Sequence, residues 1–507
     1  MLQLRTVSDT TKGPEHHHEA TFEPATLGVT PSSADALEER SPSPPGASGS
    51  GVSQSKTSGW PMWVLGLVIM IDQIDQNIVR GIETPLKADK ALHITDLKFG
   101  ILLAAFVAVN GLISVPAGYL ADRWHRTRTV GHTVIAWSAI SALTAASPNF
   151  PVLLGIRSAL GFGQAVTEPS CASLLADYYP AEERGRAFSI QQCLVFVGFG
   201  LGIGLGGFVG NHFGWRAAFL MVGTPGVLIA IAVYRLFEPK RGAADRLHLG
   251  INESGADEVE ITHGLIDEGF RQFLKDMLAG LKADLATIWS ITTMKYALIG
   301  VSALLFSITA VGAALPQYYE RTLHVAKDQA PLYVGAIIML GGIPGVLLGG
   351  RLADRYATKI RGARMAIPAY CILVGQVFFV ASYLYMPLAA AFVLEVLGAF
   401  VITLAVPALR AGLSDAIPAN LRGAGFGAFN LVSVVLGQAA ASVIVFALAS
   451  AFDHNLRTAL LLVSPPVFVG GFIFLKARDH LDEDAAKIFQ AILTAMQEQQ
   501  AREADQT

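Results

Sequence analysis

The chain has 507 residues, of which 52% are hydrophobic and 15% are charged, with a net charge of −3. A soluble protein carries about 25% charged residues, so this composition excludes an ordinary soluble domain. The near-neutral balance says nothing about a nucleic-acid partner, and no basic cluster suggests one. Cys171, Cys193 and Cys371 all fall within apolar runs, which excludes a disulfide framework or a thiolate metal site.

Residues 1–58 are rich in Ser, Pro, Gly and Glu and contain no apolar run, so a disordered cytoplasmic tail is expected there. Apolar runs of about 20 residues, long enough to cross a bilayer, follow one another from Trp60 onward. The expected spans are 60–84, 97–121, 129–147, 151–176, 187–211, 216–237, 291–315, 331–353, 364–385, 388–414, 424–450 and 457–476.

These runs predict an all-α membrane protein with 12 transmembrane helices in two six-helix bundles, at 59–237 and 290–476. The linker 238–289 places Phe270, Leu274 and Leu281 at helical spacing. It should hold an amphipathic helix on the inner membrane surface or against the bundle. Residues 477–507 are expected to form a second cytoplasmic tail.

The short loops predict the orientation, because cytoplasmic loops carry an excess of Lys and Arg. One set of loops is rich in arginine, whereas acidic residues such as Asp89 and Asp96 balance the lysines of the opposite set. The arginine-rich loops should therefore face the cytoplasm. An even number of spans then places both termini and the linker inside, in a multi-pass protein of the cell (inner) membrane.

Two motifs occur twice. Gly118-Tyr-Leu-Ala-Asp122-Arg123 is repeated as Gly350-Arg-Leu-Ala-Asp354-Arg355. The segment from Asp177 to Gly185 is repeated from Asp415 to Gly423, 238 residues later. The same offset places Arg157 opposite Glu395. Repetition at a fixed offset predicts two pseudo-symmetric halves related by an axis along the membrane normal, with a cavity between them near the middle of the bilayer.

These motifs resemble the signature of the major facilitator superfamily over residues 60–476. Asp75 and the segments following 175 and 214 are similar to the Spinster branch. The resemblance implies that charged residues at the cytoplasmic helix ends form an inner gate, in which Asp122 would meet the start of the span expected at 424–450. A purely structural anchoring role is the alternative. The gate candidates are Gly118, Asp122, Arg123, Arg126, Asp177, Arg184, Gly350, Asp354, Arg355, Asp415 and Arg422.

Ionisable side chains within the spans are costly to bury, so they are candidates for function. The first span carries Asp72 and other polar residues on one broad face, and the fourth carries a polar stripe. They would form a substrate or proton pathway, or else interhelical salt bridges. The pathway candidates are Asp75, Arg80, Glu83, Arg157, Gln164, Glu168 and Glu395.

Asp75 and Glu168 would be protonation sites, and Arg157 would pair with an acid or bind an anionic substrate group. The chain departs from the Spinster pattern in one position. Gln164 stands where the branch usually has Glu, and Glu168 follows one turn later. Any proton-coupling role at the first of these positions is therefore open.

No nucleotide-binding loop, metal-ligand cluster or catalytic triad occurs, so we expect no enzyme, cofactor or metal. The leading hypothesis is a monomeric, proton-coupled secondary transporter with alternating access. The Spinster resemblance implies an amphipathic, lipid-like substrate of the lysophospholipid or sphingoid type, handled among membrane lipids. One alternative is a carrier of a small organic anion or drug, whose substrate would bind Arg157. The other is a sensor or scaffold that transports nothing.

Overall fold

The computed structural model describes residues 59–121, 125–179, 181–239, 289–357, 362–416 and 431–481, with a few isolated positions in 275–286 and 483–486. The described part is helical and contains no strand. The tail 1–58, most of the predicted amphipathic helix and most of the second tail lie outside these residues.

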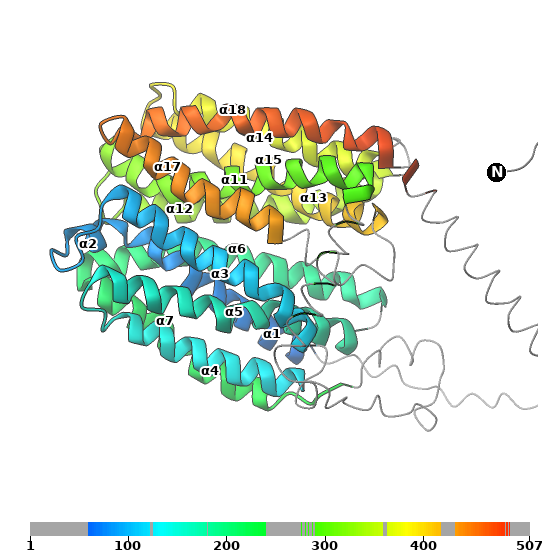
Figure 1. The fold of residues 1–507 in the computed structure, drawn as a ribbon, viewed down its shortest axis with the longest axis horizontal. Helices are drawn as coiled ribbons and strands as arrows, with labels where there is room; N and C mark the ends of the chain where they lie inside the picture. Colours follow the sequence, from blue (N-terminus) through cyan, green and yellow to red (C-terminus); the bar gives the residue numbers. More distant parts are fainter. Residues whose placement is uncertain are drawn as a thin grey trace, which may run out of the picture. The chain divides into compact units, whose positions relative to one another are not determined.

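The first half of the chain forms six long helices and one short helix (Figure 1). They are α1 (Trp60–Gly81), α2 (Glu83–Ala88), α3 (Asp96–Ala121), α4 (Arg126–Thr144), α5 (Phe150–Tyr178), α6 (Ala181–Phe213) and α7 (Trp215–Tyr234). The long helices coincide with the six spans predicted for this half.

The second half follows the same plan, with two π-helical segments inserted. Its elements are α11 (Thr292–Arg321), α12 (Ala330–Ile337), η2 (Ile338–Gly342), α13 (Ile343–Ala357), α14 (Ala363–Ser382), α15 (Leu388–Ala416), η4 (Val434–Ala439), α17 (Ala440–Ala451) and α18 (Leu456–Leu475). Ten described helical stretches are long and apolar enough to cross a membrane. Among the long helices, α4 and α5 do not meet this criterion, since both carry charged or polar residues along their length.

The first predicted span ends earlier than expected, because the helix breaks at Ile82. Pro85 has no backbone N–H with which to bond the carbonyl of Gly81 four residues earlier. The chain therefore restarts as α2 at Glu83. The end of the bundle at which α2 lies is called the α2 end below.

Glycines on α6 bring this helix close to α1. A Cβ atom at Gly198 would lie 2.3 Å from the carbonyl oxygen of Met70, and one at Gly202 would lie 2.7 Å from that of Ile74. On the other side of the contact, a Cβ atom at Gly81 would lie 2.1 Å from the oxygen of Ile203. The glycine run of α6 is thus a helix-packing surface, because small residues let two helix backbones approach closely.

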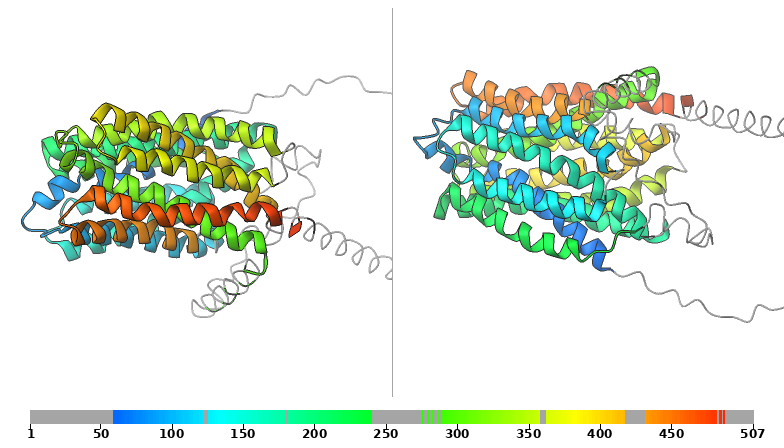
Figure 2. Two further views of the ribbon diagram at one scale, coloured as in Figure 1. Left: turned by 90° about the horizontal axis from the view of Figure 1, so that it is seen from above. Right: turned by 60° about the horizontal axis from the view of Figure 1, so that its bottom comes forward.

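Helices of the two halves meet along two seams. Helix α3 packs along α17 and η4, and α6 packs along α12 (Figure 1). The two views of Figure 2 keep the light-blue α3 beside the orange α17. At this seam Gly100 faces Ser442, whose carbonyl oxygen would lie 2.5 Å from an added Cβ atom. The candidate site lies partly within the first half, around Asp75, and partly in the interior between the halves.

Candidate functional site

Asp75 lies in the middle of a buried polar cluster inside the first half. Its side chain is fully buried, and the Nη1 atom of Arg157 lies 3.4 Å from each carboxylate oxygen. Nη2 of Arg157 donates to the backbone carbonyl of Asp75 at 3.0 Å. Gln164 donates to Oδ2 at 2.9 Å, and the Ser141 hydroxyl donates to Oδ1. Helices α1, α4 and α5 thus meet at one carboxylate.

Aromatic rings surround the arginine of this cluster. The guanidinium of Arg157 lies 5.5 Å from the ring centre of Phe106 and 5.3 Å from that of Phe219. Its side chain is 2% exposed, so few waters can replace its protein partners. A cation in such surroundings depends on its one carboxylate partner, Asp75. The pair therefore links α1 and α5 for as long as both groups are charged.

Two further carboxylates lie beside the pair. Asp72 accepts a hydrogen bond from Gln76 at 2.7 Å through Oδ2, whereas its buried Oδ1 has no partner. Both Asp75 and Glu168 interact electrostatically with Asp72. Glu168 is exposed, whereas Asp72 and Asp75 are buried. Three carboxylates, Asp72, Asp75 and Glu168, therefore lie close enough to interact electrostatically through Asp72.

The remaining candidates of the first span lie apart from that cluster. The guanidinium of Arg80 lies 5.1 Å from the ring centre of Phe199 on α6. Glu83 belongs to α2 and forms an ion pair with Lys87. Burial raises the pKa of Glu83 to about 7, although Lys87 and Arg321 act in the opposite direction. The polar residues predicted to share one face of this span therefore lie in three different environments: the Asp75 cluster, the ring of Phe199 and the short helix α2.

Glu395 has different partners from those of its repeat counterpart Arg157. It is fully buried on α15 and accepts hydrogen bonds from the hydroxyls of Tyr319 at 2.6 Å and Ser382 at 3.1 Å. The ring of Tyr319 also contacts that of Tyr333. Within the described part of the chain, the hydrogen-bond donors to Glu395 are therefore neutral hydroxyl groups.

Two inner-gate candidates hold the first half together. Arg126, buried at the start of α4, pairs with Asp177 at the end of α5 and with Glu238 beyond α7, the latter at 3.0 Å. Glu238 also accepts from the backbone and hydroxyl of Thr127 at 2.8 and 2.7 Å. Burial opposes ionisation of Glu238, but the bonds from Thr127 and Arg126 outweigh it and lower its pKa. The sequence analysis missed Glu238, which lies just past the last span of this half.

The other gate candidates are only partly described. Arg355 is exposed at the end of α13, and Gly350 is half-buried within that helix. Asp122 was predicted to contact the start of the span at 424–450, and this contact lies outside the described residues. Arg123 and Arg422 lie outside them as well. The surroundings of Gly118, Arg184, Asp354 and Asp415 are likewise not described.

At the α2 end, polar contacts join the two halves. Asp96 of α3 pairs with Lys87, with Arg321 of α11 at 3.3 Å and with His454 before α18. The Thr84 hydroxyl donates to Glu320 at 2.5 Å. The sequence predicted Asp96 only as a loop charge that balances lysines, because nothing local shows that distant loops meet. The described α2 end is therefore closed.

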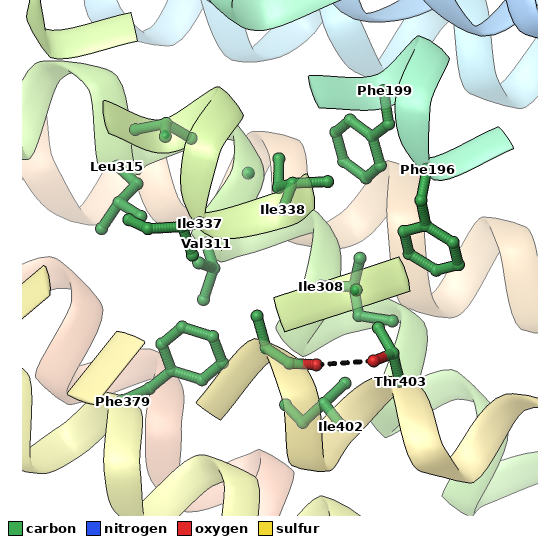
Figure 3. A pocket seen from close by; sticks show the side chains of 14 residues that line it. Phe196, Phe199, Ile308, Val311, Leu315, Ile337, Ile338, Phe379, Ile402 and Thr403 are labelled. Carbon is green, nitrogen blue, oxygen red and sulfur yellow. Dashed lines mark hydrogen bonds between the residues drawn. The ribbon is translucent and has the colours of Figure 1, made fainter. Parts of the chain in front are cut away.

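An apolar cavity of about 490 Å³ lies between the halves (Figure 3). Phe196 and Phe199 project into it from α6, opposite Phe379 of α14 and Ile402 of α15. Thr403 also lines it, but its hydroxyl bonds to carbonyls of its own helix, at 2.8 Å from Ala399 and 3.1 Å from Phe400. The wall therefore offers apolar surface to whatever enters.

Repeated helical halves with buried charged clusters and a cavity between them define a multi-pass membrane protein of the transporter class. Residues 65–442 match the model of the Major Facilitator Superfamily. Because this match covers well over half of the sequence, the chain belongs to the major facilitator superfamily, as its repeated motifs predicted.

Curated relatives include both transporters of small molecules and Spinster proteins. The chain is 31% identical to the niacin transporter NiaP of Acinetobacter baylyi over 192 residues, 37% of this chain and 43% of that protein. It is 27% identical to human protein spinster homolog 3, over 61% of this chain and 59% of the relative. The mouse homologue is 25% identical over 484 residues, 87% and 88% of the two chains.

A solved structure supports the fold. The chain superposes on a bacterial homologue of the human lysosomal transporter Spinster, in an inward-facing and unoccupied conformation, with a TM-score of 0.67. The sequences are 19% identical, and the alignment covers 85% of this chain and 98% of the other. The predicted resemblance to the Spinster branch is thus found in both sequence and fold.

Proposed function

We propose that the chain is a proton-coupled secondary transporter that moves an amphipathic, lipid-like molecule by alternating access. The observation that carries this proposal is the buried cluster of Asp75, Arg157 and Gln164 in a molecule whose central cavity is apolar. A protonatable carboxylate paired with an arginine can couple ion binding to helix movement. The cavity supplies the surface for an apolar substrate.

Proton binding at Asp75 would remove the charge that holds Arg157. The carboxylate joins α1 to α5, so its neutralisation would loosen two helices that meet at their buried centre. Exposed Glu168 and buried Asp72 would pass the proton between the open side and Asp75. Gln164 stays hydrogen-bonded in either state, since an amide has no charge to lose.

We further propose that the α2 end faces outward, so that the described conformation faces the cytoplasm and both termini lie inside. The arginine-rich loops support this orientation. Two observations support the assignment of an inward-facing conformation. Asp96 makes contacts that close the α2 end, and the similar Spinster homologue is inward-facing. The membrane would be the cell (inner) membrane, and the protein would act as a monomer.

Asp75 is the residue at which proton binding would be coupled to transport. Asp75→Asn should abolish uptake driven by a pH gradient in proteoliposomes but preserve substrate binding, because the amide cannot exchange a proton. Asp89→Asn, at the surface beside Arg216, is the matched control and should transport normally. Undiminished concentrative uptake by Asp75→Asn would disprove coupling at this residue. A comparison of lipids and metabolites in cells with and without the protein would supply the substrates to test.

A carrier of small organic anions is the second candidate, and the similarity to a niacin transporter supports it. Flux assays on both substrate classes separate the two candidates. Absence of flux for every amphiphile and organic anion tested, in a folded protein, would favour a sensor that transports nothing.

A further inference from the structure

Arg80 is a buried arginine without an ionic partner in the described part of the chain. Its side chain is 8% exposed, and its Nε atom has no hydrogen-bond partner. The other buried arginines of this half, Arg126 and Arg157, each pair with a carboxylate. An unpaired cation in an apolar interior is costly, so such a residue requires a partner that arrives during function.

The guanidinium of Arg80 adjoins the cavity between the halves. It lies 5.1 Å from the ring centre of Phe199 on α6, and Nη1 lies 3.2 Å from the position of a Cβ atom at Gly312 on α11. Both Phe199 and Gly312 line the cavity. Since glycine has no side chain, both Nη1 and the ring of Phe199 can approach the backbone of α11 here. The cation therefore lies at the edge of an otherwise apolar chamber.

We propose that Arg80 binds the anionic group of the substrate, whose apolar body fills the cavity. This inference rests on the proposed transport function and names the substrate class: an amphiphile with one carboxylate or phosphate group. A planar guanidinium matches such groups through two parallel N–H···O bonds.

The assignment differs from the role expected for Arg157. That arginine is paired with Asp75 and enclosed by Phe106 and Phe219, so an anion would have to displace an internal carboxylate to reach it. Arg80 has no such competitor among the described residues. Substrate binding at Arg80 and proton binding at Asp75 would therefore use separate groups on the same helix α1.

The same chemistry is found in lysophospholipids and in small aromatic acids, so both are tested. Equilibrium binding to the purified full-length protein would be measured with 1-oleoyl-lysophosphatidate and benzoate. Uncharged 1-oleoylglycerol and benzamide serve as isosteres. Arg80→Gln should weaken binding of whichever anionic probe the protein takes by about 10- to 100-fold, the loss expected for charge-assisted bonds. Arg80→Gln should leave the binding affinity for the uncharged isostere unchanged.

Three further variants make the test specific. Arg80→Lys should retain part of the affinity, because it keeps the charge but loses the paired bonds. Gly312→Leu should weaken binding of both the anionic probe and its uncharged isostere, because the leucine side chain would occupy the chamber. Arg216→Gln makes the same chemical change at an exposed position and should bind normally. Thermal unfolding confirms that each variant is folded.

Binding and flux are measured separately. A result that overturns the role of Arg80 can therefore be distinguished from one that overturns the proposed transport function. Equal affinity of Arg80→Gln and the unmodified protein for each bound anion would overturn the role of Arg80. The same conclusion follows if the unmodified protein binds neither anionic probe. Arg80-dependent binding without any flux would instead uphold the site and overturn the transport function.

Discussion

At the residue scale, the most constrained interaction is the pair of Asp75 and Arg157. Its carboxylate accepts from Arg157, Gln164 and Ser141, so each of the two oxygens has at least two donors. Both side chains of the pair are almost completely buried. Removal of one partner leaves an uncompensated charge in the bundle, whereas removal of both leaves none.

This asymmetry gives a stability prediction. Arg157→Met should lower the free energy of unfolding by about 3–5 kcal/mol, the cost of breaking a buried ion pair by removing one partner. Asp75→Asn combined with Arg157→Met should recover most of the loss. Thermal unfolding in detergent would compare the single variant, the double variant and the unmodified protein. A double variant as unstable as Arg157→Met alone would show that the pair does not act as a unit.

The sequence identified the members of this cluster but not their pairing. Charge inside an apolar run identifies Asp75, Arg157 and Glu168 without any structure. Ser141 carries no comparable signal, because an isolated hydroxyl in a span is common. The isolation of Arg80 also depends on α6 and α11, which the spacing along one helix does not reveal.

At the element scale, α6 is notable because it contacts α1 in its own half and α12 in the other. Gly198 and Gly202 face α1, whereas Gly200 approaches the carbonyl oxygen of Gly335, which would lie 2.8 Å from an added Cβ atom. Backbones thus approach closely on two sides. One helix therefore packs closely against both α1 and the seam between the halves.

Close packing predicts sensitivity to a single methyl group. Gly202→Ala places a Cβ atom 2.7 Å from the carbonyl oxygen of Ile74, so it should destabilise the protein by about 1–3 kcal/mol. Gly185→Ala is the matched control on the same helix, because an added Cβ atom there meets nothing within 4 Å. Unfolding temperatures of the two variants would be compared. Equal temperatures would contradict the close contact between α1 and α6.

At this scale the sequence predicted most of the architecture. Apolar runs and the 238-residue repeat correspond to the long helices of both halves. The break at Ile82 was missed, although Gly81 followed by Pro85 is a recognisable signal for it. The π-helical segments were missed because no local residue pattern separates them from an α-helix.

At the scale of the whole molecule, the contacts at the α2 end decide which side is open. Thr84 meets Glu320, and Gln317 donates to the Thr84 hydroxyl at 2.9 Å. Asn211 also crosses the seam and donates to the carbonyl of Lys327 at 3.0 Å. Under the proposed alternating access, an outward-open state would separate the halves at this end, so transport would require all these contacts to break.

A cross-link at this contact should therefore stop transport. Cysteines at positions 84 and 320, in a background without Cys171, Cys193 and Cys371, should be joined by a short bis-methanethiosulfonate reagent, because the Thr84 hydroxyl meets the end of the long Glu320 side chain in the native contact. Uptake should fall to background and recover on reduction. Proteolysis within the linker, followed by gel electrophoresis, would verify the cross-link. Full uptake by cross-linked protein would contradict alternating access through the α2 end.

The π-helical segment η2 gives the cavity wall a second possible register. A π turn holds one residue more than an α turn, so a return to α-helical bonding would rotate later residues by about 100°. Ile338 and Gly342 of this segment both line the cavity. Such a rotation would exchange the side chains at the wall while the helix axis stays in place. Chamber volume would then adapt to substrates of different length independently of the rocking of the halves.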